Sequence, residues 1–582
     1  RQETLVTGLT TDEISRRGAD HTTNGIRMGI DGWIYIAVGD FGFTEARGAD
    51  GRTLGRRGGG IVRVRPDGTD MEIHNWGQRN ILDVCIDPYM NLFTRDNTND
   101  GGGWDIRLSH VFQSGEYGYP SLYLNFPEEI LPPLADYGGG SGCGGMYLHD
   151  LRWPDAFGDA VYTCDWGRSE VYRHKLPTRG VTFDAHQEVF LKIPRPTDID
   201  VDGSGRMYVA SWKNGKFAFT GPNVGFVAQI TPVDYIPKPF PDLEAASDTE
   251  LVAYLGEPSA AYRLHAQREL LRRGVTEGRW GKVAQAAAVP DAPLYGRVAA
   301  IYTLAQFGDD ASYARLLKLV ADASVREFAL RALTDRRSGL KALPLAPFVE
   351  ALQDANPRVR AQALICLGRL GRAEAAGAML PLTMRLPNEP KPTAKSLHKQ
   401  PDPGRVIPHL AVRALADCEA VEACLDAIPG PYADGALATL KTLHKKEVVL
   451  GLTSQLSRVR DAAVRRQILT ALVRLYFREG EYKGGWWGTR PDRTGPYFDR
   501  QRWAESSRIE AVLTRYLKES DTETGKYVAT QLIRHQVEIE GIAEVVAAGQ
   551  KTAPMTAIQL PKVAPDNPNL IGNLKFELAE ER

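Results

Sequence analysis

The feature that most constrains the fold is a helical segment that recurs in the second half of the chain. Its copies are YRLHAQRELLRRG, GRVAAIYTLAQFG, VREFALRALTDR and VRAQALICLGRLG. The corresponding arginines are separated by 34, 29 and 34 residues, at Arg263, Arg297, Arg326 and Arg360. One helix pair of this length cannot bury its apolar face alone, so repeated pairs must stack. The period predicts an α-solenoid of HEAT type over 247–548, with insertions at 386–408 and 484–503.

Residues 1–235 carry a different pattern, in which an aspartate turn joins two short strands. The copies are IRMGIDGWIYIAVGD, DVCIDPYMNLFTRD and DIDVDGSGRMYVAS. Alternating apolar residues around Asp-Gly or Asp-Pro turns indicate antiparallel hairpins. Such sheets form propellers or sandwiches, and the recurrence of one hairpin type favours an all-β propeller. The prediction is a multidomain chain with a propeller at 1–235, a linker at 236–246, the solenoid, and a proline-rich tail at 549–582.

Charge and cysteine content exclude some functions. The chain has 71 basic and 72 acidic side chains, so it offers no electrostatic drive toward nucleic acid or an anionic membrane. No apolar run reaches the about 20 residues of a membrane-spanning helix. The six cysteines include no Cys-x-x-Cys motif. Cys143 and Cys164 lie in one β-rich region, where they form either a disulfide or two buried thiols.

The stretch HTTNGIRMGIDGWIYIAVGD, from His21 to Asp40, resembles a hairpin of the soluble quinoprotein glucose and aldose-sugar dehydrogenases. The likeness continues in order through RVRPDGT, WGQRN, TRDNTNDGGGWDIRL and GEYGYP, and covers roughly residues 15–232. That family consists of six-bladed propellers that carry pyrroloquinoline quinone (PQQ) with calcium. A propeller fused to HEAT-like repeats also resembles the multidomain proteins called PVC-type membrane-bound dehydrogenases, in which a cytochrome c domain often follows the solenoid.

The resemblance implies roles for individual residues. His21 takes the general-base position, where an imidazole that titrates near neutrality can remove a hydroxyl proton. Arg79 and Asn80 take the positions that hold the quinone carbonyl oxygens. This chain has Arg168 at the family's lysine position, and of two paired arginines that contact the cofactor carboxylates it retains Arg195.

An oxygen-rich loop follows in DNTNDGGGWD. Side-chain oxygens alternate at Asp96, Thr98 and Asp100, with Asn99 close by and a glycine at position 101. Calcium binds six to eight such oxygens, and a glycine lets the loop fold around the ion. The candidate metal ligands are Asp96, Asn99 and Asp100, and the alternative is a plain Asx-turn loop.

The insertion at 484–503, GGWWGTRPDRTGPYFDRQRW, is unusually aromatic for a solenoid. Exposed tryptophans can stack on sugar faces. The hypothesis is a lid over the propeller face in which Trp486, Trp487 and Arg490 touch a substrate or partner. The alternative is that these side chains pack back on the solenoid helices.

The leading functional hypothesis is a sugar or alcohol oxidoreductase that uses PQQ and calcium and passes electrons to a cytochrome c. The resemblance implies a periplasmic or otherwise extracytoplasmic protein. It also implies one to two blades ahead of His21, which an absent N-terminal segment, a partner chain or another domain would supply. The alternative is a non-catalytic propeller–solenoid scaffold that binds a glycan or protein, since both architectures present broad surfaces. A calcium-dependent lyase or hydrolase is a third hypothesis, without an assigned residue set.

Overall fold

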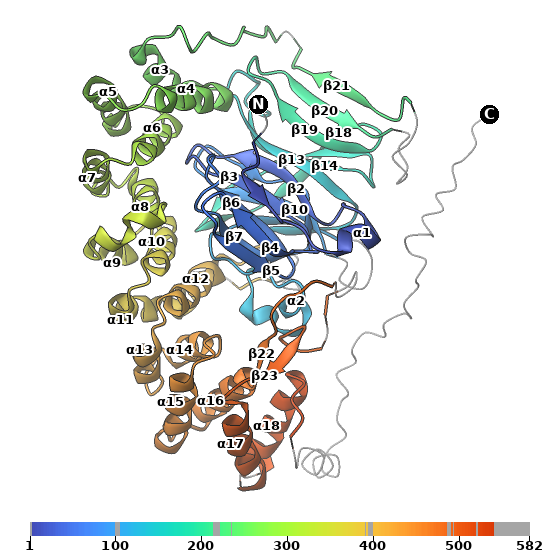
Figure 1. Cartoon of the computed structure of the whole chain (residues 1–582), viewed down its shortest axis with the longest axis vertical. Coiled ribbons are helices and arrows are strands. Elements are labelled where there is room, and N and C mark those ends of the chain that lie inside the picture. Colours follow the sequence, from blue (N-terminus) through green and yellow to red (C-terminus); the bar gives the residue numbers. More distant parts are fainter. Residues whose placement is uncertain are drawn as a thin grey trace, which may run out of the picture.

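The structure, a computed structural model, describes residues 3–98, 105–213, 222–233, 235–389, 391–393, 400–485, 491–492, 494–519 and 522–539. The helices of the second half form a curved column, and the sheets of the first half lie against its inner side (Figure 1). Within these residues no helix combines the length and apolar character needed to cross a membrane.

Four antiparallel sheets of blade size follow one another along the first half. The strands of the first are β2 (Thr23–Met28), β3 (Ile34–Val38), β6 (Gly59–Val64) and β7 (Glu72–Gln78). Those of the second are β8 (Asn80–Ile81), β9 (Cys85–Ile86), β10 (Leu92–Asn97), β11 (Asp105–Val111) and β12 (Ala135–Gly139). Those of the third are β13 (Gly142–His149), β14 (Asp159–Asp165), β15 (Glu170–Lys175) and β18 (His186–Lys192). Those of the fourth are β19 (Pro196–Val201), β20 (Met207–Ser211) and β21 (Phe226–Ile230).

Smaller elements complete this half. They are β1 (Val6–Thr7), β4 (Phe43–Gly48) and β5 (Thr53–Arg56) in one sheet, the pair β16 (Thr178–Arg179) and β17 (Thr182–Phe183), and the short helices α1 (Glu13–Arg17) and α2 (Leu122–Asn125). A single 3-10 turn, η1 (Pro127–Glu129), follows α2. No strand pairing closes the four large sheets into a barrel within the described residues.

The three predicted hairpins are confirmed as antiparallel pairs, and one device shapes all their turns. In each turn the aspartate side chain accepts a hydrogen bond from a backbone N–H two residues later. Asp31 accepts from Trp33 at 3.3 Å, Asp87 from Tyr89 at 2.8 Å, and Asp202 from Ser204 at 2.9 Å. The repeated aspartate is therefore an Asx-turn that reverses the chain between strands.

Arg27 of β2 ties the four sheets together. Its guanidinium pairs with Asp83, ahead of β9, at 3.3 Å and with Asp200 of β19 at 3.0 Å. It also donates to the carbonyl of Gly145 in β13 at 3.4 Å. All four blade-sized sheets, through a strand or an adjoining loop, therefore contact the Arg27 guanidinium.

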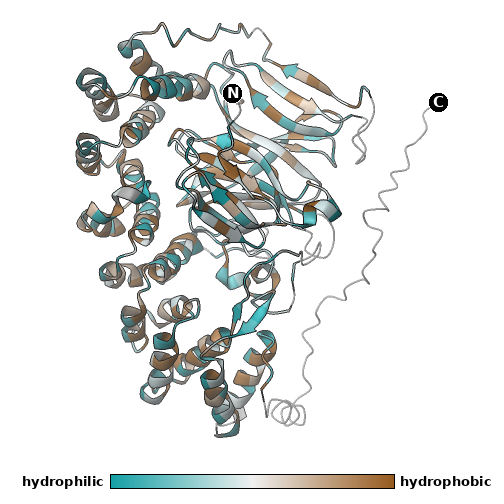
Figure 2. Ribbon diagram, viewed as in Figure 1, coloured by the Kyte–Doolittle hydropathy of each residue, from teal (hydrophilic) through white to brown (hydrophobic). Residues whose placement is uncertain are grey.

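The second half is a solenoid of antiparallel helix pairs that runs from residue 248 to residue 534. Figure 2 shows hydrophobic and hydrophilic residues on the same helices, as expected for elements with one buried face. The longer helices are α3 (Asp248–Tyr254), α4 (Ala260–Arg272), α5 (Glu277–Ala288), α6 (Leu294–Phe307), α7 (Asp310–Leu319), α8 (Arg326–Thr334), α10 (Pro357–Leu370), α12 (Pro403–Asp417), α13 (Val421–Ala427), α14 (Ala433–Leu440), α15 (Lys446–Arg458), α16 (Ala462–Leu475), α17 (Ser506–Glu519) and α18 (Thr522–Arg534). Shorter helices α9 (Ala346–Glu350) and α11 (Ala376–Met379) complete the pairs.

The recurring arginine has a structural explanation. Arg263 donates to the carbonyl of Glu257 at 2.6 Å, Arg326 to that of Val320 at 2.7 Å, and Arg360 to that of Asp354 at 2.6 Å. Each acceptor lies six residues upstream, where the preceding helix has just ended. Because carbonyls at a helix end lack intrahelical partners, a guanidinium from the next helix satisfies them.

The sheets and the solenoid share one interior rather than touching at a surface. Trp33 and Tyr35 of the first sheet belong to the same hydrophobic cluster as the solenoid helices. At the same contact, Trp33 Nε1 donates to Asp335 Oδ2 at 2.7 Å. Arg63, with no exposed side-chain surface, pairs with Asp335 at 3.1 Å and with Glu72 at 2.6 Å. The sheet region therefore completes part of its hydrophobic core with side chains of the solenoid helices.

Several predicted segments can now be placed. Helix α12 begins at Pro403, so it includes the last residues of the predicted insertion 386–408. Proline is tolerated in the first turn of a helix, which allows the helix to start at this residue. In the second insertion, β23 (Arg500–Arg502) pairs with β22 (Phe477–Glu479). The tail at 549–582 lies outside the described residues. All six cysteines, Cys143 and Cys164 included, are free thiols.

Candidate functional site

His21 lies between α1 and β2. The residues that follow β3, at the far end of the first hairpin, lie beside it. Gly39 N–H donates to the carbonyl of Thr22 at 2.7 Å, and Phe41 N–H donates to that of His21 at 3.1 Å. These bonds bring Asp40 beside the imidazole, and its Oδ1 is hydrogen-bonded to His21 Nδ1. The Phe41 ring stacks on the imidazole with a centroid distance of 5.3 Å. Position 39 must be glycine, because a Cβ there would lie 2.5 Å from the His21 carbonyl oxygen.

Asp40 is a fully buried carboxylate between the His21 imidazole and the Arg79 guanidinium. Its Oδ2 lies 3.9 Å from Nε of Arg79, and both side chains have no exposed surface. Burial alone would raise the pKa of Asp40, but His21 and Arg79 outweigh it and hold that pKa below its ordinary value. Asp40 is therefore ionised, and it orients the imidazole through Nδ1 so that Nε2 faces away from it.

Arg79 continues the network into the second sheet. Its side chain donates to Asn97 Oδ1, and its backbone N–H donates to Asp96 Oδ2 at 2.9 Å. Asp96 also accepts from Arg107 Nε at 2.8 Å. His21, Arg79 and Asp96, which the sequence predicts to act together, thus lie in one buried chain of hydrogen bonds and ion pairs.

Two buried polar atoms near this network have no hydrogen-bond partner within the described residues. One is the side-chain oxygen of Asn80, whose residue is 7% exposed. The other is the hydroxyl of Tyr119, whose residue is 2% exposed and which interacts electrostatically with Arg79. A buried polar group without a partner is costly, so these atoms mark places where a ligand or water would complete a bond.

Arg168 and Arg195 lie together, around the third sheet. The backbone N–H of Arg168 donates to Asp165 at 3.0 Å, and Arg195 stacks over the Trp166 ring at 4.8 Å. Asp165 pairs with Arg95 at 2.8 Å. Arg95 and Asp96 are consecutive on β10, so their side chains point to opposite faces of the strand. No contact within the described residues joins Arg168 or Arg195 to the His21 network.

The predicted metal and lid residues are only partly covered. Asp96 accepts hydrogen bonds and forms an ion pair with Arg107. The described residues contain no group of three or more His, Cys, Asp or Glu side chains that could hold a metal ion. Asn99 and Asp100 lie outside the described residues, and so do Trp486, Trp487 and Arg490.

The described start of the aromatic insertion and the segment just before it reach the sheet region. Gly485 N–H, inside the insertion, donates to Asp12 Oδ1 at 3.2 Å. The hydroxyl of Tyr482 donates to the carbonyl of Phe41 at 2.7 Å, directly beside Asp40. The Arg57 guanidinium lies over the Tyr482 ring at 4.8 Å. The insertion therefore borders the loop that holds His21.

Sequence reasoning missed Asp40 and Arg107. Asp40 lies two residues after β3, and the pairing of β2 with β3 places the two ends of that hairpin side by side. A histidine ahead of the first strand and a Gly-Asp after the second were a readable signal. Arg107 gave none, because one arginine in an alternating strand is typical of an exposed face.

Comparison with known proteins gives partial matches. Residues 1–129 match the model of a domain of unknown function, DUF7133, and residues 345–373, which span α9 and α10, match the HEAT repeat model. No curated protein matches the chain.

Solved structures with a likeness include an oxidoreductase of glucose dehydrogenase type from Thermus thermophilus (18% identity, TM-score 0.29) and the PQQ-bound aldose sugar dehydrogenase from Streptomyces coelicolor (18% identity, TM-score 0.27). Each covers 36% of this chain, and the chain spans 66% and 61% of their lengths. The match to an engineered protein covers 53% of this chain and 86% of the engineered protein's length, with 16% identity and a TM-score of 0.24. The strand pairings, the helix pairs and the HEAT match show a chain of successive antiparallel sheets followed by a HEAT-like solenoid.

Proposed function

We propose that the sheet region is an oxidoreductase site that oxidises a sugar or another alcohol with a quinone cofactor. The observation that carries the proposal is the arrangement in which Asp40 holds His21 through Nδ1 while Arg79 lies against the other oxygen of the same carboxylate. An imidazole held by a buried carboxylate is suited to accept a proton, because the carboxylate stabilises the imidazolium that forms.

The chain's own residues would act on the substrate hydroxyl. His21 Nε2, the nitrogen not held by Asp40, would accept the hydroxyl proton as the alcohol becomes a carbonyl. Asp40 fixes the orientation of the ring, and Arg79 helps to keep Asp40 ionised at neutral pH. A bound quinone would supply the acceptor for the two electrons that leave with the C–H hydrogen.

The residues beside His21 fit the carbonyl end of a quinone. Asn80 has an amide whose NH2 group can donate to a carbonyl oxygen, and the neighbouring Arg79 is a buried cation. The Asn80 side-chain oxygen, which lacks a partner within the described residues, would instead accept a hydrogen bond from a hydroxyl. In the proposal these two residues bind the carbonyl oxygens, and Arg168 and Arg195 are the cations available for the carboxylates of PQQ. The choice of PQQ, rather than another quinone, rests on the sequence resemblance.

The proposal includes further parts. Calcium would bind the loop that carries Asp96, Asn99 and Asp100, and a cytochrome c would receive the electrons. The insertion with Trp486 and Trp487 would cover the substrate. A location outside the cytoplasm, a partner chain that completes the propeller, and membership of the PVC-type dehydrogenases complete the hypothesis.

The test is reconstitution of the full chain with PQQ and calcium, followed by dye reduction with a panel of aldoses and alcohols. We expect substrate-dependent reduction that His21→Gln abolishes. The matched control is His186→Gln, which changes an exposed histidine on β18 and should keep wild-type activity. The melting temperature should rise with PQQ and calcium in all three proteins.

A non-catalytic scaffold is the second candidate. The observation that favours it is that Arg79 is fully buried and held by Asp40 and Asn97, as a structural arginine would be. Absence of dye reduction, together with an unchanged melting temperature on addition of PQQ and calcium, would support the scaffold and end the redox proposal.

A further inference from the structure

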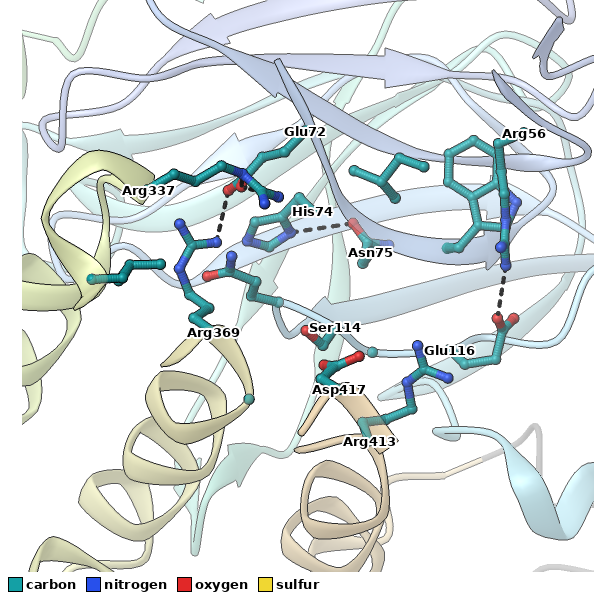
Figure 3. A pocket seen from close by; sticks show the side chains of 16 residues that line it. Arg56, Glu72, His74, Asn75, Ser114, Glu116, Arg337, Arg369, Arg413 and Asp417 are labelled. Atoms are coloured by element: carbon teal, nitrogen blue, oxygen red, sulfur yellow. Dashed lines mark hydrogen bonds and ion pairs between the residues drawn. The ribbon is translucent and has the colours of Figure 1, made fainter. Parts of the chain in front are cut away.

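Two adjoining cavities lie between the sheets and the solenoid, away from His21. The larger has a volume of about 800 Å³ and the smaller about 380 Å³. Both are lined by Arg56, Trp76 and Glu116 of the sheet region and by Arg413 of α12. Figure 3 shows the smaller cavity, where Arg413 reaches from its helix toward Glu116, which is joined to Arg56. A volume of 800 Å³ lies within the usual range for small-molecule sites.

The larger cavity has an excess of positive charge. Of the described residues that line it, eight are arginine or lysine and five are aspartate or glutamate. Arg405, Arg413 and Arg478 line the cavity and form no close ion pair within the described part of the chain, although Asp402 and Glu128 act on Arg405 at longer range and Asp417 lies near Arg413. Arg56 pairs with Glu116 at 3.6 Å, and its side chain is 47% exposed. Cations gathered without matching carboxylates favour an anionic occupant.

Two buried polar groups in the cavity wall also lack partners among the described residues. Arg474 is 6% exposed; one end of its guanidinium pairs with Glu129 at 3.1 Å, but its Nε and Nη1 have no hydrogen-bond acceptor there. The Tyr119 hydroxyl, on the sheet side of the same cavity, has none either. Unpaired N–H groups on a buried guanidinium are costly, and an oxyanion is the acceptor that matches them best.

Aromatic side chains also line the larger cavity, and each ring has an arginine over one face, so the other face is the one open to a ligand. Trp76, Tyr119, Tyr482 and Tyr497 all line the larger cavity. Tyr482 and Tyr497 come from the solenoid half, at and beside its second insertion, and Trp76 and Tyr119 come from the sheet half. An aromatic ring offers an apolar face to a flat ring, while arginine offers paired donors to carboxylate or phosphate.

We infer that this interface is a binding site for a small anionic sugar, that is, a sugar ring that carries a carboxylate or phosphate group. The oxyanion lies against Arg413, Arg405 and Arg474, and the sugar ring lies on the aromatic residues. The site does not depend on the redox proposal, although Tyr119 in its wall also interacts with Arg79 of the His21 network. Its cations come from helices α12 and α16, so a bound sugar would join the solenoid to the sheets.

The test is isothermal titration of the full chain, without cofactor, with four probes: glucuronate, glucose 6-phosphate, inorganic phosphate and neutral glucose. We expect saturable binding of glucuronate, glucose 6-phosphate or both, weaker binding of phosphate, and none of glucose. The two anionic sugars separate a carboxylate from a phosphate source. The dissociation constant should rise with added salt, because charged contacts are screened.

Variants locate the site. Arg413→Gln and Arg405→Gln should each raise the dissociation constant at least tenfold, and each removes a partly exposed cation, which should leave the fold intact. Arg268→Gln, on an exposed position of α4, is the matched control and should bind as the wild type does. No saturable binding up to about 10 mM, a value that corresponds to negligible affinity, would overturn the inference. So would binding that both cavity variants leave unchanged, or phosphate binding as tight as that of glucose 6-phosphate.

Discussion

Glu129 offers the sharpest test of how the sheets and the solenoid are joined. It lies in η1 of the first half, and its carboxylate is 2.7 Å from Lys441 Nζ and 3.1 Å from Arg474 Nη2, both in the solenoid. The three side chains are 12%, 19% and 6% exposed. Replacement by glutamine removes the only charge that Arg474 pairs with in the described chain and leaves a buried cation behind.

The size of the effect follows from the pKa. Burial would raise the pKa of Glu129, but Arg474 and Lys441 outweigh it and lower that pKa from 4.5 to about 2. Because the folded-state pKa is the lower one, the stabilisation is complete above 4.5 and disappears as the pH falls toward 2. The shift corresponds to about 3 kcal/mol at pH 7 and about 2 kcal/mol at about pH 3.5. The first figure agrees with the about 3 kcal/mol typical of a broken buried ion pair.

The assay is urea unfolding of wild type, Glu129→Gln and Glu128→Gln at both pH values, with hydrogen exchange of α16 as a local readout. Glu128 is the matched control, since it pairs with Arg534 at 2.6 Å but the two side chains are 51% and 38% exposed. Its loss should cost under about 1 kcal/mol. Equal destabilisation by the two variants, or a loss in Glu129→Gln that does not shrink with acid, would refute the reasoning.

Three further predictions test other contacts. Asp335→Asn should destabilise the contact between the two halves by about 3 kcal/mol, because it leaves Arg63 and Arg65 without this carboxylate, and should accelerate limited proteolysis between the halves. Gly77→Ala should lower the melting temperature by several degrees, because φ is +89° there and the new Cβ would lie 2.3 Å from a backbone nitrogen. If the redox proposal holds, Asp40→Asn should reduce turnover at least tenfold by releasing His21 Nδ1, whereas the quinone-induced rise in melting temperature should persist.

The parts of the fold that could be predicted are those set by local chemistry. The aspartate turns repeat because each carboxylate accepts from the backbone two residues later, as at Asp87 and Asp202. The solenoid period was visible because each repeat needs a guanidinium at one position, as at Arg326, to satisfy the end of the preceding helix. Both devices act within a few residues, so a single sequence displays them.

The interface between the halves could not be predicted. Arg63 and Glu72 lie in strands of alternating pattern, where charged residues usually face solvent, yet the solenoid buries both. Arg63 contacts Asp335, which is 272 residues further along the chain, and Glu72 contacts Arg337, which is 265 residues further along. The partner of Arg63, Asp335, follows helix α8 and reads as an exposed C-terminal cap. The strand pattern around Arg63 does not indicate that Asp335 is its partner, and the helix pattern around Asp335 does not indicate Arg63. The two segments meet only when the solenoid packs on the sheets, and they are 272 residues apart in the chain.

The smaller cavity separates two kinds of arginine that the sequence presents alike. On one side Arg337 and Arg369 both pair with Glu72, which Arg63 also holds, so each of these cations has a carboxylate partner and the group is structural. On the other side Arg413 faces the cavity without an ion pair in the described chain. Arg413 is only partly exposed, and the carboxylate that it acts on is Asp417, one turn further along α12, with which it forms no close ion pair. The charge left over at this junction is what makes it a binding site for an anion rather than a further part of the core.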